Sequence, residues 1–164
     1  MVEFSHLDKM NKSRMVDITQ KEPSLREAHA SGKVVMKRET IEEIEAHNMA
    51  KGDVFGVAKI AGIMAAKKTS SIIPLCHPLE LTGIDIMFST DRERGEVTID
   101  AEVRTFGRTG VEMEAMTAVS AAALTIYDMC KSADREMILT DIKLVRKSGG
   151  RSGLFERSKK EKPA

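Results

Sequence analysis

The sequence predicts an α+β fold in which helices pack on one face of an antiparallel sheet. Residues 82–90 and 96–105 both alternate apolar and polar side chains with a period of two, which is typical of two half-buried strands joined as a hairpin. Helical segments precede and follow this pair, and an extended segment lies towards each end of the chain. Elements in this order are expected to form one sheet with its helices on a single face.

The first predicted element is a strand at residues 24–37, "SLREAHASGKVVMK". Its opening "LREAHA" is also compatible with a helix, but Gly32 and the following "VVM" favour an extended segment with a bend. A short helix is predicted at residues 40–48, because Thr40 and Glu43 have the spacing of a capping box.

A second helix is predicted at residues 54–69, with Asp53 as its N-cap. Gly56 and Gly62 lie inside this helix and weaken it unless another backbone packs close to them. Its expected buried side consists of apolar residues at helical spacing, namely Val54, Val57, Ala58, Ala61, Met64 and Ala65.

The hairpin formed by residues 82–105 is expected to close through "DRERG", where Gly95 supplies the turn. An alanine-rich helix follows at 111–131, and a last strand covers 137–147. The side chains expected to share a face within each strand are Ile84, Ile86 and Phe88; Val97, Ile99, Ala101 and Val103; and Ile138, Thr140, Ile142 and Leu144. The complete order matches the ferredoxin-like split βαβ pattern. The thin alanine-rich helix suits a subunit interface and an ordinary core equally well.

Composition limits the classes of function. The chain has 164 residues and a formal net charge of +1, so it fits one domain and lacks the basic excess of a bulk nucleic-acid-binding protein. Two cysteines make no disulfide framework, which indicates a reducing compartment and predicts a cytoplasmic protein. No apolar stretch has the length of a signal peptide core or a membrane span. We expect a flexible segment at 1–14, a single domain at 15–154 and a flexible charged tail at 155–164.

The stretch "SIIPLCHPL" places Cys76 beside His77. A metal site, a nucleophile with its base, and a plain structural loop are three interpretations. No further cysteine or histidine lies at metal-ligand spacing, which argues against a metal. Neighbouring side chains of an extended loop point to opposite sides, so the two residues are not expected to face one cleft. A structural loop with a hydrogen-bonded histidine is the simplest reading of this stretch alone.

The segment "FGRTGVEMEAM" precedes and opens the alanine-rich helix. Free N–H groups at a helix start, together with Arg108, suit an anion. Glu112 and Glu114 fall in the first turn, where acidic residues either stabilise the helix dipole or serve a site. Two glycine-containing basic segments, "AKGD" at 50–53 and "KSGGRSG" at 147–153, also suit phosphates, although neither has Walker A spacing.

Asp128 and Lys131 lie three positions apart near the end of the same helix. This spacing gives either a weak surface ion pair or a charged pair held for catalysis. Basic loops, one histidine and paired acids together predict an enzyme that acts on a small phosphorylated molecule. A non-catalytic nucleotide- or RNA-binding module and a pure assembly scaffold are the alternatives, but the outward positions Asp85, Asp100 and Glu102 would repel RNA.

Three segments carry a resemblance to a known family: "KGDVFGVAKIAGIMAAKKTSSIIPLCHPL", "RTGVEMEAMTAVSAAALTIYDMCK" and "KSGGRSG". From about Met15 to Leu154 the chain resembles the cyclic pyranopterin monophosphate synthases, the molybdenum cofactor biosynthesis protein C family. The resemblance implies conversion of 3′,8-cyclo-7,8-dihydro-GTP to cyclic pyranopterin monophosphate with release of pyrophosphate. It also implies a ferredoxin-like fold and a homohexamer, a trimer of dimers, with active sites between subunits. No cofactor or membrane is implied, and Mg²⁺ carried by the substrate phosphates is compatible with the reaction.

The resemblance also assigns expected roles to single residues. Asp128 in "YDMCK" is the expected active-site aspartate, and Lys131 and Lys51 are expected to join it in catalysis. The remaining residues are expected to bind substrate: Leu75, Cys76, His77, Glu112, Met113 and Glu114 around its ring, and Arg26, Lys68, Arg108, Lys147 and Arg151 as candidate phosphate contacts.

Overall fold

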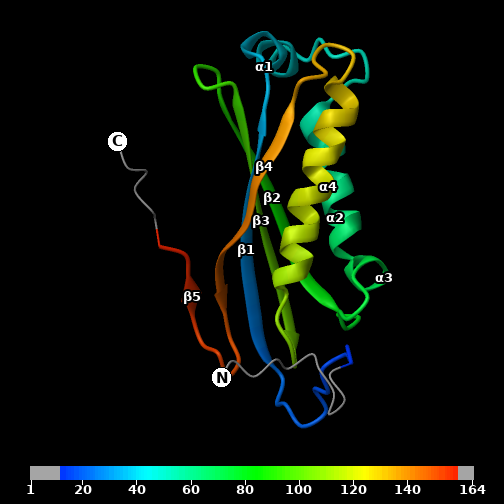
Figure 1. Ribbon diagram of the computed structural model, residues 1–164, viewed down its shortest axis with the longest axis vertical. Helices are drawn as coiled ribbons and strands as arrows, with labels where there is room; N and C mark the ends of the chain where they lie inside the picture. Colours follow the sequence, from blue (N-terminus) through cyan, green and yellow to red (C-terminus); the bar gives the residue numbers. More distant parts are fainter. Residues whose placement is uncertain (1–11, 159–164) are drawn as a thin grey trace.

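The computed structural model describes residues 12–158. Within them, five antiparallel strands form one sheet in the order β2-β3-β1-β4-β5, and α2 and α4 lie against one face of it (Figure 1). The first four strands have the ferredoxin-like order, so the predicted fold class is confirmed. The elements are β1 Ser24–Val35, α1 Arg38–Glu45, α2 Val54–Ala66, α3 Thr69–Ile72, β2 Leu81–Asp91, β3 Glu96–Gly107, α4 Glu112–Cys130, β4 Ile138–Ser148 and β5 Phe155–Glu156.

The core lies between the sheet and the two long helices. The alternation predicted for β3 is confirmed, because its inward side chains are fully buried. Small residues let the backbones approach closely: a Cβ on Gly32 would lie 2.6 Å from a side-chain atom of Val119 on α4. A Cβ on Gly62 would lie 2.9 Å from the main-chain oxygen of Ala118, so α2 and α4 are in close contact at this point, as the sequence required.

The first helix differs from its prediction. α1 begins at Arg38, two residues earlier than expected, and Thr40 is buried inside it, so the Thr40–Glu43 capping box does not form. The carboxylate of Asp134 replaces the expected cap, because its Oδ2 accepts a hydrogen bond of 2.9 Å from the amide of Lys37. A cap supplied from 97 positions away leaves no local sequence signal.

The second helix begins as predicted, with Asp53 accepting a hydrogen bond of 2.9 Å from the Gly56 amide. It ends at Ala66, and residues 69–72 form the separate helix α3. The predicted buried side is partly wrong: the residues that face the core are Val54, Ala58, Gly62 and Ala66. Val57 and Met64 are instead exposed, together with Ile60, and form an apolar stripe on the outside of α2. We refer to Val57, Ile60 and Met64 as the α2 stripe.

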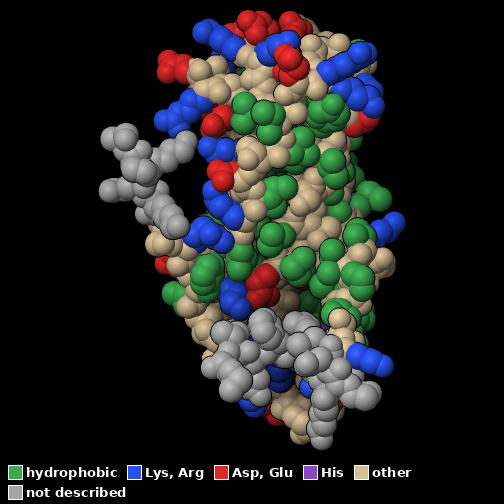
Figure 2. Space-filling view, in the orientation of Figure 1, with side chains coloured by type: hydrophobic (Ala, Val, Ile, Leu, Met, Phe, Trp, Pro, Cys, Tyr) green, Lys and Arg blue, Asp and Glu red, His purple; other side chains and the backbone are tan. Residues whose placement is uncertain are grey.

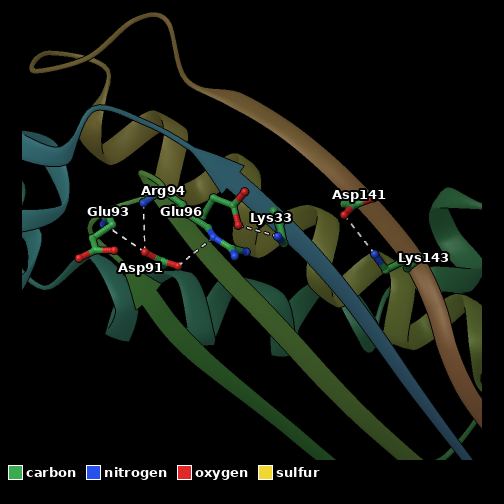
Figure 3. Close-up of polar contacts among 7 residues, drawn as sticks. All are labelled: Lys33, Asp91, Glu93, Arg94, Glu96, Asp141 and Lys143. Carbon is green, nitrogen blue, oxygen red and sulfur yellow. Dashed lines mark hydrogen bonds and ion pairs between the residues drawn. The ribbon is translucent and has the colours of Figure 1, made fainter. Parts of the chain in front are cut away.

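The last long strand also corrects the predicted alternation. Asp141 has a φ of +60°, and the register of the pairing between β4 and β1 shifts twice, once between Thr140 and Lys143 and once at Val145. Each shift turns the following side chains to the opposite face. Leu139, Ile142 and Leu144 therefore pack against the core while Ile138 is exposed. Figure 3 shows Asp141 with its ion-pair partner Lys143, at 3.1 Å.

The sheet face away from the helices carries charged pairs in its middle, together with the exposed apolar side chains of Leu25, Met87 and Phe106. A hydrogen bond of 2.8 Å joins His29 to Asp100 on this face, and an ion pair of 2.5 Å joins Lys33 to Glu96. At the β2–β3 turn, Gly95 has a φ of +64° as predicted, and Asp91 accepts hydrogen bonds from two backbone amides. Figure 3 shows this turn beside the Lys33–Glu96 pair.

The flexible ends expected from the sequence are described only in part. Residues 1–11 and 159–164 lie outside the described residues. Within the tail expected from residue 155 onwards, Phe155 and Glu156 form β5, which pairs with Arg146 and Lys147 of β4. No helix in residues 12–158 combines the length and the apolar character needed to cross a membrane.

Candidate functional site

A basic cleft of about 610 Å³ opens where β1 begins, β4 ends and the loop before α4 passes. Four of the five candidate phosphate contacts line it, namely Arg26, Arg108, Lys147 and Arg151. The fifth, Lys68, does not line this cleft. It lies just before α3, where its side chain is exposed to solvent. The cleft thus gathers cations from three separate parts of the sequence, which suits a polyanion.

Arg26 forms the floor of the basic cleft. It is 8% exposed, and its Nε donates a hydrogen bond of 3.3 Å to the Gly107 oxygen. Gly149 and Gly150 both have positive φ, and a Cβ on Gly150 would lie 1.4 Å from a guanidinium nitrogen of Arg26. Only glycine permits this backbone to pass so close to the arginine, which explains the glycine pair in the 147–153 loop.

A second cleft of about 410 Å³ adjoins the basic one, and Lys21, Thr109, Gly110 and Glu112 line both. Glu112 is held by an ion pair of 2.8 Å with Lys147. A Cβ on Gly110 would lie 1.9 Å from a Glu112 oxygen, so this glycine makes room for the carboxylate at the junction of the clefts.

The second cleft brings together the predicted ring-binding residues. Its walls are Val16, Ile18, Lys21, Leu75, Cys76, His77, Leu79, Thr109, Gly110, Glu112, Met113 and Glu114. Cys76 and His77 therefore face the same cleft, and the prediction that they point apart is wrong. The physical reason is a turn: the Cys76 amide donates to the Ile73 oxygen at 3.1 Å, so the segment is not extended and its side chains do not alternate.

Glu114 is the buried acid of this second cleft, with only 4% of its surface exposed. Burial, together with the nearby charge of Glu112, raises the pKa of Glu114 to about 7. Burial and then the charge of Glu114 raise the pKa of the Cys76 thiol as well. Cys76 is thus protonated at neutral pH, which disfavours the interpretation of Cys76 and His77 as a nucleophile with its base.

A separate charged cluster lies at the other end of α4. The carboxylate of Asp128 accepts from the Lys51 Nζ at 2.6 Å and from the Lys131 Nζ at 2.7 Å. Hydrogen bonds from Lys131 and Lys51 lower the pKa of Asp128 to about 2, and Asp128 in turn raises the pKa of Lys131. All three side chains are about half exposed, so the cluster is open to a ligand.

One chain does not bring these two regions together. Glu114 and Asp128 lie 14 positions apart on the same helix, which separates them by about 21 Å along its axis. Figure 1 shows α4 running lengthwise, with one end at the top of the molecule near α1 and the other below the middle of the sheet, and Figure 2 shows hydrophobic side chains gathered over α4 and α2. The expected catalytic and substrate-binding residues thus form two sites within a single chain.

The sequence left some cleft residues unrecognised. Lys21 lines both clefts, yet the irregular segment around it has no periodicity or glycine pattern that would indicate a site. Asp134, which lines neither cleft, was also missed, because no local sequence pattern indicates that it is buried and bonded to the start of α1. Among residues 12–158, no group of three or more histidine, cysteine or acidic side chains could hold a metal ion.

Comparison with known proteins gives consistent matches along the chain. The MoaC family model matches residues 15–150. A cyclic pyranopterin monophosphate synthase of Pelotomaculum thermopropionicum is 59% identical over 96% of this chain and 93% of its own length. Proteins of the same name from a Thermoanaerobacter species and from Clostridium acetobutylicum are each 54% identical over 94% of this chain, and cover 98% and 96% of their own lengths.

Proposed function

This chain belongs to the MoaC family and is a cyclic pyranopterin monophosphate synthase of molybdenum cofactor biosynthesis, and from this premise we propose how its residues divide the reaction. The substrate is the nucleotide-derived 3′,8-cyclo-7,8-dihydro-GTP, and the products are cyclic pyranopterin monophosphate and pyrophosphate. The observation that carries this proposal is the pair of adjoining clefts, one basic and one lined by His77, Glu112 and Glu114. Together they match a triphosphate joined to a purine-derived ring.

The triphosphate occupies the basic cleft. Arginine forks and a lysine at its walls match the geometry and charge of phosphate oxygens. The backbone of Gly149 and Gly150, which has positive φ, adds N–H groups at the same place. Lys147 is paired with Glu112 before substrate binds, and the phosphates compete with this carboxylate for its ammonium group.

The ring occupies the adjoining cleft. Glu114 and His77 can exchange hydrogen bonds with the edge of the ring, and the turn at 73–76 presents the backbone of Leu75 to Cys76. A glutamate with a pKa of about 7 donates a hydrogen bond when protonated and only accepts when ionised. It can therefore meet either a carbonyl oxygen or an N–H group of the substrate.

Asp128, Lys51 and Lys131 act on the bound substrate. An aspartate with a pKa of about 2 is a poor general base, so Asp128 orients the two ammonium groups, and its charge raises the pKa of Lys131. The lysines donate protons during opening of the five-membered ring and stabilise negative charge on the phosphate as it is attacked. In that step a ribose hydroxyl passes its proton to a lysine left neutral by the earlier proton donation, and its oxygen bonds to the α-phosphorus. The bond from that phosphorus to the bridging oxygen breaks, and pyrophosphate leaves.

The cluster and the clefts join across subunits. The distance of about 21 Å between Glu114 and Asp128 supports a site completed by a second copy of the chain. The α2 stripe supports such an assembly, because an apolar helix face of this kind is typical of a subunit contact. We extend this to a homohexamer built as a trimer of dimers, working in the cytoplasm.

No step of this proposal passes through a metal held by the protein, because the described residues offer no cluster of donors for one. Mg²⁺ would be carried by the phosphates of the substrate, whose oxygens are the ligands it prefers.

Product analysis tests the proposed function. Purified protein incubated with the cyclised GTP derivative should release pyrophosphate and the cyclic monophosphate in equal amounts, measured by mass spectrometry. Binding of the substrate without any turnover would favour a non-catalytic module instead.

A further inference from the structure

Asp134 is a buried carboxylate that the catalytic proposal leaves unused. Only 2% of its surface is exposed. Its Oδ2 accepts a hydrogen bond of 2.9 Å from the Lys37 amide, and its Oδ1 accepts one of 3.0 Å from the Glu136 amide. Both oxygens are thus engaged by backbone N–H groups, an arrangement that is costly to disturb inside a protein.

The first connection of Asp134 is to the end of α4. The amides of Ala133 and Asp134 donate to the Cys130 oxygen at 2.9 and 3.0 Å, which folds residues 130–134 into a tight turn. Lys131 lies within this turn, and Asp128 lies in the last turn of the helix before it. The position of Asp134 therefore fixes the backbone from which the Lys131 side chain extends.

The second connection is to the segment that supplies Lys51. Lys37 is the N-cap of α1, and the chain runs from α1 through a turn at 49–52 to Lys51. Lys51 then reaches back to the end of α4, where its Nζ donates to the Asp128 main-chain oxygen at 2.9 Å. A carboxylate at the start of α1 also suits the positive end of its dipole.

We propose that Asp134 is a positioning residue for catalysis, because its carboxylate joins the two chain segments that carry Lys51 and Lys131; this inference rests on the function proposed above. Asp134 touches no substrate. It acts by fixing the position of α1 relative to the end of α4, so that Lys51 and Lys131 can both contact Asp128.

The variant Asp134→Asn tests the inference. Asparagine places an NH₂ group where one carboxylate oxygen stood, so one backbone amide loses its acceptor. We expect kcat to fall about tenfold to a hundredfold, as a small displacement of catalytic groups does. The KM should change by less than about twofold, because substrate is bound chiefly by the clefts at the far end of α4.

Two comparisons separate positioning from general destabilisation. Asp91 also accepts hydrogen bonds from two backbone amides, at 3.1 and 3.0 Å, both through its Oδ1 in the β2–β3 turn (Figure 3). Asp91→Ala removes both bonds, one more than Asp134→Asn does, and should leave kcat unchanged. Lys37→Pro removes the backbone N–H group that donates a hydrogen bond to Asp134 Oδ2. The φ of −64° at this position suits proline. This variant should lower kcat as Asp134→Asn does, and it serves as the test if the asparagine variant fails to fold.

A double variant tests the route of the effect. If Asp134 acts through the lysine cluster, adding Asp134→Asn to Asp128→Asn, which already releases both lysines, should lower kcat by less than about twofold further. A fully additive loss, an unchanged kcat in a folded Asp134→Asn protein, or an equal loss in Asp91→Ala would overturn the inference. An unmodified protein that forms no product would instead refute the proposed function, so the two failures are distinguishable.

Discussion

Lys51 and Asp128 lie 77 positions apart, yet the Lys51 ammonium contacts both the carboxylate and the main-chain oxygen of Asp128, at 2.6 and 2.9 Å. The contact closes the segment after α1 onto the end of α4. Because Lys131 reaches the other carboxylate oxygen, a single aspartate organises two cations on one open surface.

The variant Asp128→Asn should lose about a hundredfold or more in kcat, because both lysines lose the negative charge that orients them. Its melting temperature should change little, since exposed ion pairs contribute little to stability. Steady-state kinetics and thermal unfolding measure the two effects. Asp85→Asn is the matched control, because it breaks the exposed 2.6 Å pair with Arg104 and should stay active. Full activity in Asp128→Asn would contradict the assigned role.

Lys147 and Lys68 provide a test of the basic cleft. Lys147→Ala should raise the KM for the substrate about tenfold, because a cation that faces the phosphates is lost. Lys68→Ala removes the same charge outside both described clefts and should leave the KM within about twofold. If both variants weakened binding equally, the phosphates would not be bound where we place them.

Glu114 should make stability depend on pH. Its pKa is 4.5 without the effect of the fold and about 7 in the folded protein, so the folded state holds an extra proton between these values. Stability should therefore fall as pH rises from 4.5 to 7 and should then level off. Glu114→Gln stays uncharged and should be more stable than the unmodified protein at pH 8, by up to about 3 kcal/mol.

Urea unfolding at pH 5 and at pH 8 measures this difference for Glu114. Glu43→Gln, which changes an exposed glutamate on α1, should leave the pH dependence as it is. Equal pH dependence in the Glu114→Gln and unmodified proteins would show that burial does not hold the extra proton on this carboxyl.

The composite site predicts complementation between inactive variants. Asp128→Asn damages the cluster and His77→Ala damages the clefts, and each should be nearly inactive alone. If a site takes its two parts from different subunits, a random 1:1 mixture restores about a quarter of the sites. The mixture is made by co-refolding and assayed for product. Activity no higher than that of the separate variants would indicate that each site is built within one chain.

We predict that the α2 stripe is the subunit contact that brings the clefts and the Asp128 cluster together. Ile60→Asp should produce smaller particles in analytical ultracentrifugation and low activity, because a charge opposes burial of an apolar face. Lys59→Asp introduces the same side chain at the neighbouring exposed position and should preserve the assembly. Equal assembly in both variants would exclude the α2 stripe as a subunit contact.

Much of the fold was predictable, because its signals are local. The alternation in β3, the turn at Gly95 and the Asp53 cap each depend on a few neighbouring residues, and all three form as expected. The errors arise where a distant partner intervenes. α1 starts early because Asp134 caps it from another part of the chain, and β4 changes face because Asp141 adds a residue to its pairing.

For the functional residues, the sequence alone identified the chemical groups and the helix that carries Glu112, Glu114 and Asp128. Only the tertiary structure decided how they combine. A turn sends Cys76 and His77 into one cleft, packing buries Glu114 and raises its pKa, and the length of α4 keeps Glu114 about 21 Å from Asp128. Local patterns specify elements through short-range sterics and hydrogen bonds, whereas distances between sites and the burial of charges arise when those elements pack.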